Sequence, residues 1–463
     1  MFAIPGILAL IFFIYIRPQE ILLDLQRLPL LYIFFALALF GFAVDLRLRV
    51  NKASLVPHLP WVIVLFLWGI VTLVAKQPDQ AVHASIDFTI SLILFFVISH
   101  SVHTFRAFQA IAGLLLALAL TLAIIGIHQG TADYGCVMID PRSTGDLSVG
   151  TPDGRSCRPL SDLDCYLQGE PEPGADYICE RVGLFGATSV AGRVRYLGVL
   201  QDPNELALAL CIGLPFAFAF ASRRRSSAGT VLAVFSLLTV GVCVHYTQSR
   251  GGQLVLLSVL GVYAVWKWRW KAVAAMVIMA PVALILTGGS SGRVDAAAST
   301  EERYEAWMTG LQLFRESPIF GVGQGQFTQH HHLTAHNSYV LALSETGFIG
   351  FLLWAGILYM SFKTVLLAVI RYRDVEEARI AHAWGLAMLA AMAGLSVGIF
   401  FLSFSWHAIY WIYTGLVGAY YSAIRTHDPE FRVRMGLGDW MAVLGGTIGL
   451  FILLYGYLRM HGY

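Results

Sequence analysis

Residues 335–350 read AHNSYVLALSETGFIG: a polar step from His336 to Tyr339 leads directly into an apolar segment that carries a single acid, Glu345. The apolar segment continues to about residue 370, which is long enough to cross a hydrocarbon core of about 30 Å. Polar side chains at the mouth of a membrane helix are costly to desolvate, so they are kept mainly where they have a function. The stretch therefore predicts a membrane-spanning helix, long or broken, with a functional site at its mouth.

The composition of the whole chain is that of a membrane protein. Of its 463 residues, 57% are hydrophobic and only 13% are charged, and the mean hydropathy is +0.67. A soluble domain carries about 25% charged residues. Apolar runs long enough to span a bilayer recur from end to end, which predicts an all-α, polytopic transmembrane helical bundle with about 12–13 spans. The net charge of +2 says nothing about nucleic acid by itself, but no basic patch interleaved with aromatic residues occurs, so nucleic acid is not expected as a partner.

Two long polar segments divide the predicted spans. The predicted organisation is, in chain order, N-terminal helices 1–127, a polar loop 128–194, helices 195–287 that carry arginine motifs, a polar loop 288–337, and C-terminal helices 338–463. The second polar loop contains an amphipathic helix at 301–315, and the span that precedes this loop lies at about 272–287. The first apolar run, 2–16, lacks a basic n-region and a small-residue cleavage site, which favours a retained helix over a removed signal peptide.

Short basic loops determine the predicted orientation, because loops rich in lysine and arginine stay in the cytoplasm. Six basic segments fall on one side of the predicted bundle: Arg47 to Lys52, Arg106, Arg223 to Arg225, Lys267 to Lys271, Arg371 to Arg373, and Arg432 to Arg434. Both long polar loops and the turn at Arg250 then face the outside. We therefore expect the polar mouth at His336 to lie on the outer face of the membrane.

The loop 128–194 contains a cysteine cluster. Four of the six cysteines lie in it: Cys136, Cys157, Cys165 and Cys179. In an oxidising space such a loop forms two disulfides, with three possible pairings. The alternative is a four-cysteine zinc site, but no C-x-x-C pair occurs, so the spacing favours disulfides.

Three polar clusters fall at the outer boundary of the predicted helices. They are centred on Arg195 at a helix start, on Arg250 in a turn, and on His336. A guanidinium stays charged and matches phosphate oxygens with two hydrogen bonds, and Gly251-Gly252 lets a ligand approach the backbone at a helix N-terminus. A histidine near neutral pKa accepts a proton from a hydroxyl. The pattern predicts an anion site beside a general base.

Each cluster also has a structural explanation. An arginine at a helix end commonly anchors the membrane interface, which accounts for Arg193 and, taken alone, for Arg250. Residues 202–204 (Asp-Pro-Asn) are ordinary turn chemistry. Adjacent histidines at 330–332 point in different directions and lack a carboxylate–histidine pattern, so we expect no metal site. The depth of Glu345 in its helix favours a structural role over acid catalysis.

Taken together and in this order, the motifs resemble the O-antigen ligase and O-antigen polymerase superfamily of bacterial membrane glycosyltransferases. The resembling pieces are R-x-x-G-x-x-x-D-P-N-x-L-A (195–207), S-R-G-G (249–252), R-x-x-x-W (303–307), P-I-F-G-V-G-x-G-x-F (318–327) and H-N-x-Y-x-x-x-L-x-E-x-G-x-x-G (336–350). The four-cysteine loop lies outside this pattern. The resemblance implies a bundle of the C-type glycosyltransferase kind in the bacterial inner membrane, with its active site facing the periplasm.

The resemblance also implies a reaction. Its donor is a glycan on undecaprenyl diphosphate, and its acceptor is a hydroxyl of lipid A core, of another glycan, or of a protein. Arg195 and Arg250 would clamp the diphosphate, and His336 would act as general base on the acceptor, with inversion at the anomeric carbon. No metal and no cofactor is expected, because cation clamps stabilise a leaving group that is already good. The substrate-binding candidates are Arg193, Arg303, Asn337, Tyr339 and Asn204.

The alternatives differ in the acceptor or in the class of protein. A ligase, a polymerase of repeat units and a protein O-oligosaccharyltransferase share this chemistry, and the sequence leaves the acceptor open. The non-enzyme alternative is a transporter of lipid-linked sugar. A transporter predicts ionisable residues near mid-membrane and inverted repeats. The charges lie at the predicted helix ends and the two halves do not resemble each other, which favours a transferase.

Overall fold

The computed structural model describes residues 2–49, 55–79, 81–139, 150–169, 172, 174–223, 227–275 and 296–463. Its long helices are α1 (Ala3–Ile16), α3 (Leu30–Arg47), α4 (Leu59–Lys76), α5 (Ala81–Ser101), α6 (Phe105–Thr131), α8 (Pro203–Arg223), α9 (Ser227–Thr247), α10 (Arg250–Trp268), α12 (Ala296–Glu316), α13 (Ser338–Arg371), α14 (Arg379–Gly398), α15 (Ala408–His427) and α16 (Leu437–Met460). The short helix α2 (Pro18–Ile21) follows α1. Among these, α12 contains the amphipathic helix expected at 301–315.

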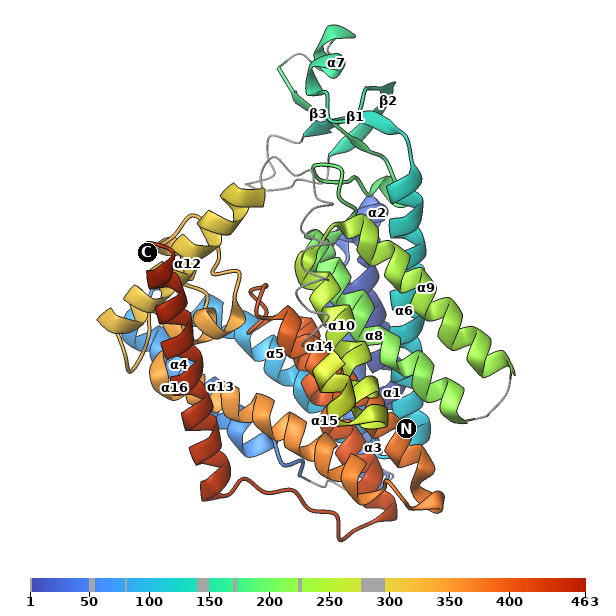
Figure 1. The fold of residues 1–463 in the computed structure, drawn as a ribbon, viewed down its shortest axis with the longest axis vertical. Coiled ribbons are helices and arrows are strands. Elements are labelled where there is room, and N and C mark those ends of the chain that lie inside the picture. The colour runs from blue at the N-terminus through green and yellow to red at the C-terminus, as the bar shows by residue number, and fades with distance from the viewer. Residues whose placement is uncertain are drawn as a thin grey trace.

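The helices pack side by side into a bundle (Figure 1). Among the described residues, 8 helices are long and apolar enough to cross a membrane, and Ala3–Ile16 and Phe88–Ser101 are shorter apolar helices. Large aromatic side chains such as Trp354, Trp384 and Trp411 are fully buried, so the interior is a packed core. The predicted all-α, polytopic bundle is therefore confirmed. The span expected at 272–287 falls mostly on residues 276–295, which lie outside the described residues.

Contacts between helix ends gather several of the basic segments at one end of the bundle. Arg371, at the end of α13, donates from Nε to Asp428 Oδ2 at 2.9 Å, just beyond the end of α15. The guanidinium of Arg373 lies 5.4 Å from the ring centroid of Trp266 near the end of α10. Residues 52, 224 and 225 of the predicted basic loops lie outside the described residues. The grouping agrees with the expected topology, and the assignment of this end to the cytoplasm stays a prediction.

Helix α13 is broken where the sequence leaves open a long or broken helix. Gly347 has a φ of 65°, and a Cβ there would meet a backbone carbonyl oxygen at 2.1 Å. The break frees carbonyls of the preceding turn, and a loop supplies their donors: Val322 N–H to the Ser344 oxygen at 2.9 Å and Gly323 N–H to the Glu345 oxygen at 3.0 Å. Buried backbone groups need such partners, so the loop and the break require each other.

A small disulfide-linked subdomain follows α6. Three antiparallel strands, β1 (Tyr134–Ile139), β2 (Thr151–Ser156) and β3 (Asp176–Arg181), pair in the order β2-β1-β3. The short helix α7 (Asp162–Leu167) projects beyond the sheet (Figure 1). Disulfides join Cys136 to Cys165 and Cys157 to Cys179, which confirms the two bridges and gives their pairing. The sequence does not predict the sheet, because β2 reads TPDGRS and has no apolar alternation.

The pairing makes a test by mass spectrometry possible. Closing loops of 29 and 22 residues stabilises the subdomain by about 3–4 kcal/mol per bridge in the chain-entropy model. We expect denatured, unreduced protein to alkylate at two cysteines, Cys211 and Cys243, and reduced protein to alkylate at all 6. The matched variant Cys136→Ser with Cys165→Ser should keep the unreduced count and lose two sites after reduction. Six alkylated cysteines without reductant would contradict the pairing.

Candidate functional site

A cavity of about 930 Å³ lies where α8, α10, α12, the mouth of α13 and α16 approach one another. Five of the eight residues singled out in the sequence line it: Arg193, Asn204, Arg250, Arg303 and His336. Two carboxylates, Asp202 and Glu302, accompany the three arginines, so the polar lining has an excess of positive charge. The remaining lining is mainly apolar, and much of it comes from α16 through Leu450, Leu453, Leu454 and Met460. The cavity is therefore amphipathic.

One side-chain oxygen, Asn204 Oδ1, joins two of the arginine-bearing segments. It accepts a hydrogen bond from Ser249 Oγ at 2.6 Å and a longer one from Arg193 Nη2 at 3.4 Å. Arg193, which is 9% exposed, also donates from Nε to the Thr247 carbonyl at 3.0 Å, at the C-terminal end of α9. A cation is favourable there because the helix end carries partial negative charge. The contacts orient Arg193 on the cavity wall and link it to the α9–α10 turn.

Residues 202–205 start α8 with a capping arrangement. Asp202 Oδ1 accepts the backbone N–H of Asn204 at 2.6 Å, and Glu205 Oε2 accepts the backbone N–H of Asp202 at 3.3 Å. Pro203 takes the first helical position, where the missing N–H costs nothing. Such reciprocal bonds satisfy the orphan amides at a helix start. The Asp-Pro-Asn motif thus has its turn function and also places Asp202 and Asn204 on the cavity wall.

The α9–α10 turn brings Arg250 to the cavity as the first residue of α10. Ser249 caps the helix by accepting the backbone N–H of Gly252 at 2.9 Å. A Cβ at Gly252 would lie 2.4 Å from the Cβ of Ala207, so this glycine lets α10 approach α8 closely. The Arg250 side chain is exposed and reaches the cavity from this rigid start.

His336 lies at the mouth of α13 and lines the cavity. Its backbone is left-handed, with a φ of 44°, a conformation rare for residues other than glycine. The backbone N–H of His336 donates to Ser403 Oγ at 3.0 Å, and Ser338 Oγ donates to the Leu402 carbonyl at 2.6 Å. The segment after α14 therefore holds this mouth in place, a contact that no local sequence signal indicates.

Asn337 and Tyr339 do not line the cavity. Asn337 is fully buried and caps α13 by accepting the backbone N–H groups of Tyr339 at 2.9 Å and Val340 at 3.2 Å. Its Nδ2 has no hydrogen-bond partner among the described residues. Tyr339 donates from its hydroxyl to the Ser396 carbonyl at 3.0 Å and so fastens α13 to α14. In this structure both residues position their helix, and a contact with substrate stays a prediction.

Arg195 also lies away from the cavity lining and is only 2% exposed. Its Nε donates to the Thr188 carbonyl at 2.8 Å, and its backbone N–H donates to Gln129 Oε1 at 2.9 Å. Burial lowers the pKa of the Arg195 guanidinium, while the carboxylates of Glu180 and Asp202 act in the opposite direction. A direct contact between Arg195 and a ligand in the cavity would require the residues around it to move, because its side chain is buried and does not line the cavity. The sequence could not distinguish Arg195 from Arg193 two residues earlier.

Glu180 connects the disulfide subdomain to the arginine segment and was not singled out in the sequence. From β3 its carboxylate accepts the Ser189 hydroxyl and the backbone N–H groups of Ala191 at 2.5 Å and Gly192 at 3.1 Å. The last of these contacts is at Gly192, the residue before Arg193, so Glu180 helps to hold the segment that carries Arg193. The only sequence signal is an acid next to Cys179, which does not identify its partners.

Helices α12 and α16 are joined at the cavity wall by a pair of tyrosines. Tyr304 and Tyr457 have their hydroxyl oxygens 2.6 Å apart. Burial, followed by the hydrogen bond to Tyr457, raises the pKa of Tyr304 to about 12, so this phenol stays neutral at ordinary pH. Both residues line the cavity, and neither could be found from sequence because they are 153 residues apart.

Glu345 is buried, and both of its carboxylate oxygens accept hydrogen bonds. This agrees with the structural role that its position deep in the helix favours. Its Oε2 accepts Trp406 Nε1–H at 2.7 Å and its Oε1 accepts the backbone N–H of Phe327 at 3.3 Å. It is 2% exposed and does not line the cavity. The carboxylate thus fixes the 318–327 loop against α13, and the two motifs of the sequence form one structural unit.

The fold and the cavity define a polytopic helical membrane protein with an arginine-lined, amphipathic site. Residues 234–355 match the family model described as O-Antigen ligase. The matched segment contains Arg250, Arg303 and His336 but ends before α16. The match supports the assignment of the chain to the O-antigen ligase and polymerase family, a group of membrane glycosyltransferases.

Other comparisons add little. One similar solved chain comes from "Structural coordination of polymerization and crosslinking by a peptidoglycan synthase complex", with 16% identity and a TM-score of 0.40 over 81% of this chain and 98% of that chain. No curated protein matches the sequence.

The Ser249 hydroxyl gives a direct test of the joint between α8 and α10. Ser249→Ala removes both the cap on Gly252 and the bond to Asn204, and a lost helix cap costs about 1 kcal/mol. We expect the midpoint of thermal unfolding of the purified protein to fall by about 1–2 °C. Ser236→Ala is the matched control, because among the described residues that hydroxyl bonds only the Leu232 carbonyl within α9. An equal effect of the two changes would show that the joint contributes nothing.

Proposed function

We propose that the protein transfers a glycan from undecaprenyl diphosphate to an acceptor hydroxyl on the periplasmic face of the bacterial inner membrane. The observation that carries the proposal is the cavity in which Arg193, Arg250, Arg303 and His336 meet beside an apolar wall. The match of residues 234–355 to the O-antigen ligase model supports the same class.

The polar half of the cavity fits a diphosphate leaving group. Three arginines face two carboxylates in the lining, and guanidinium groups bind phosphate oxygens through short, charge-assisted hydrogen bonds. Arg250 and Arg193 come from segments that Asn204 ties together, so their positions are coupled before any ligand binds. Preorganised cations of this kind stabilise the charge that develops as the sugar–phosphate bond breaks, and the mechanism needs no metal.

The apolar half fits a polyprenyl chain. Leu453 and Leu454 of α16, with Phe400, bring hydrocarbon surface to the same cavity as the arginines. Burial of each methylene group contributes about 0.8 kcal/mol, so a long isoprenoid gains much of its affinity there. A soluble sugar nucleotide would not use this wall, which favours a lipid-linked donor.

His336 is the proposed general base. It lies on the cavity wall at the mouth of α13, where its ring can accept the proton of an acceptor hydroxyl that attacks the anomeric carbon. Attack from the face opposite the diphosphate inverts the configuration at that carbon. A positioned base contributes about 10²–10⁴-fold to the rate.

The sequence assigns the diphosphate clamp to Arg195, but Arg193 is better placed for direct contact. Arg193 lines the cavity, whereas Arg195 is buried against Thr188. Direct contact with the diphosphate is therefore proposed for Arg193 with Arg250 and Arg303, and Arg195 is proposed to support the segment that carries Arg193. Arg195 in direct contact remains the alternative that binding measurements decide.

The acceptor distinguishes three forms of the proposal. Ligation to lipid A core, polymerisation of repeat units and transfer to a protein hydroxyl all use the same donor chemistry. The experiment is to supply one defined undecaprenyl-diphosphate oligosaccharide to the purified protein with each acceptor and to identify the product by mass spectrometry. Transport of the lipid-linked sugar without transfer to any acceptor would overturn the enzymatic proposal.

Substitutions should separate binding from chemistry. His336→Ala should lower turnover by about 10²–10⁴-fold with the dissociation constant of the donor nearly unchanged. Arg250→Ala and Arg303→Ala should weaken donor binding by about 10–100-fold, since a hydrogen bond to a charged group contributes about 1.5–3 kcal/mol. Arg315→Ala is the control, because Arg315 is an exposed cation on α12 that does not line the cavity.

The same assays contain the contradicting results. Normal turnover in His336→Ala would exclude this histidine as the base. A larger loss of donor affinity in Arg195→Ala than in Arg193→Ala would restore Arg195 as the clamp and would mean that the residues covering Arg195 move on binding.

A further inference from the structure

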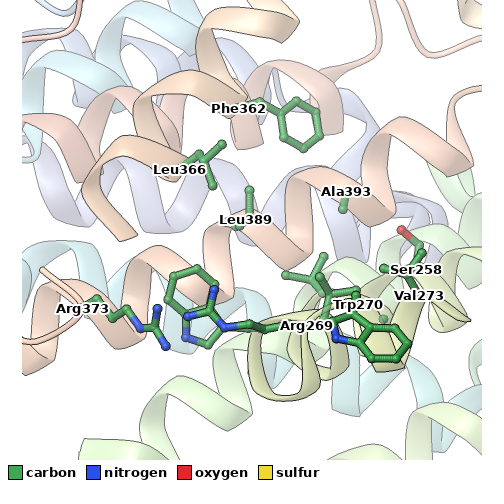
Figure 2. Close-up of a pocket in the computed structure, with 13 residues that line it drawn as sticks. Ser258, Arg269, Trp270, Val273, Phe362, Leu366, Arg373, Leu389 and Ala393 are labelled. Carbon is green, nitrogen blue, oxygen red and sulfur yellow. The ribbon is translucent and has the colours of Figure 1, made fainter. Parts of the chain in front are cut away.

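A second hollow, of about 670 Å³, lies at the other end of α10. It is bounded by α10, the residues just after it, α13 and α14 (Figure 2). Arg250 begins α10 and Arg269 directly follows it, so the 19 residues of the helix place about 28 Å between these two arginines. That distance is close to the thickness of a hydrocarbon core, so the arginines of the two hollows lie at opposite membrane boundaries.

The walls of this hollow are apolar. Figure 2 shows four of the lining residues, Phe362 and Leu366 from α13 and Leu389 and Ala393 from α14. The indole of Trp270 lies at its edge, a position that tryptophan favours at membrane interfaces. These walls lie within the depth of the bundle, so hydrocarbon is the expected occupant.

Two arginines, Arg269 and Arg373, line the same hollow. In Figure 2 the side chains of Arg269 and Arg373 point toward each other. Arg373 lies 5.4 Å from the ring centroid of Trp266 and 4.0 Å from the carboxylate of Asp374. Asp374 is 92% exposed, and an exposed ion pair at that distance contributes little. The end of the groove therefore has an excess of positive charge that an anion would balance.

We propose that this groove binds an anionic phospholipid of the leaflet opposite the candidate active site. The phosphate would lie between Arg269 and Arg373, and an acyl chain would lie along Leu366, Leu389 and Ala393. The inference is independent of the proposed glycosyl transfer, because it rests on another cavity. The lipid-linked donor is a poor occupant, since its diphosphate site lies at the far end of α10.

The bound lipid has a structural consequence for the helices it touches. It would contact α10, α13 and α14 together. Arg250 begins α10 at its opposite end, and His336 lies two residues before the opposite end of α13. A ligand that binds only the folded state stabilises it by mass action. The lipid would thus hold together three helices, two of which present site residues at the opposite boundary.

The test uses the full chain in detergent, titrated with dioleoylphosphatidylglycerol or dioleoylphosphatidylcholine and followed by native mass spectrometry. We expect the wild-type protein to bind the anionic lipid about tenfold more tightly, and the variant Arg269→Ala with Arg373→Ala to lose this preference. Lys271→Ala is the matched control, because it removes a charge next to the groove without being part of its lining, and its preference should be unchanged.

A second variant tests the apolar wall separately from charge. Ala393→Phe fills the groove and should weaken retention of both lipids by a similar factor. Equal affinity of the two lipids for the wild-type protein, or the same loss in Lys271→Ala as in the double variant, would overturn the proposal. Selective loss of undecaprenyl phosphate binding in the double variant would overturn it as well, because the occupant would then be a polyprenyl lipid.

Discussion

The hydrogen bond from Ser249 Oγ to Asn204 Oδ1 joins the start of α10 to the start of α8 at the membrane boundary. Polar groups at this depth need partners in the protein because hydrocarbon offers none. The side-chain oxygen of Asn204 accepts hydrogen bonds from both Ser249 and Arg193. The turn at residues 202–204 and the cationic site therefore belong to one hydrogen-bond network. A change in either motif therefore disturbs the other, although they are about 45 residues apart and each appears unremarkable alone.

The same constraint shapes the opposite wall of the site. The break at Gly347 leaves backbone carbonyls that the 318–327 loop satisfies, and the buried Glu345 fixes that loop from within the helix. Trp406 completes the carboxylate's partners, and the neighbouring segment holds the mouth of α13 at His336. An acid deep in a membrane helix thus serves to orient backbone, and the catalytic candidate gains its position from contacts that lie mostly outside its own motif.

Hydrophobic runs predict the helices because each must cover the thickness of a bilayer, and the capping residues around 202–205 and 249–252 mark true helix starts. The sheet at 134–181 is not predicted from the sequence. Strands are recognised by alternating apolar residues that face a core, and here disulfides hold the sheet in place of such a core. The sequence also does not predict which of Arg193 and Arg195 lines the cavity. Both residues are arginines in an irregular segment, and only the contacts with Thr188 and Asn204 show which side chain lines the cavity.

The family match and the cavity differ in extent, and this difference bears on specificity. Residues 234–355 supply Arg250, Arg303 and His336, three of the four residues to which the proposed transfer assigns direct roles. The apolar lining comes largely from residues 400–401 and 450–460, and Arg193 precedes the matched segment. Most of the proposed polar contacts thus lie within the matched segment, while most of the apolar surface proposed for the lipid lies outside it. The last helix, joined to α12 by the Tyr304–Tyr457 pair, therefore carries much of the apolar wall that the proposed lipid-linked donor would contact.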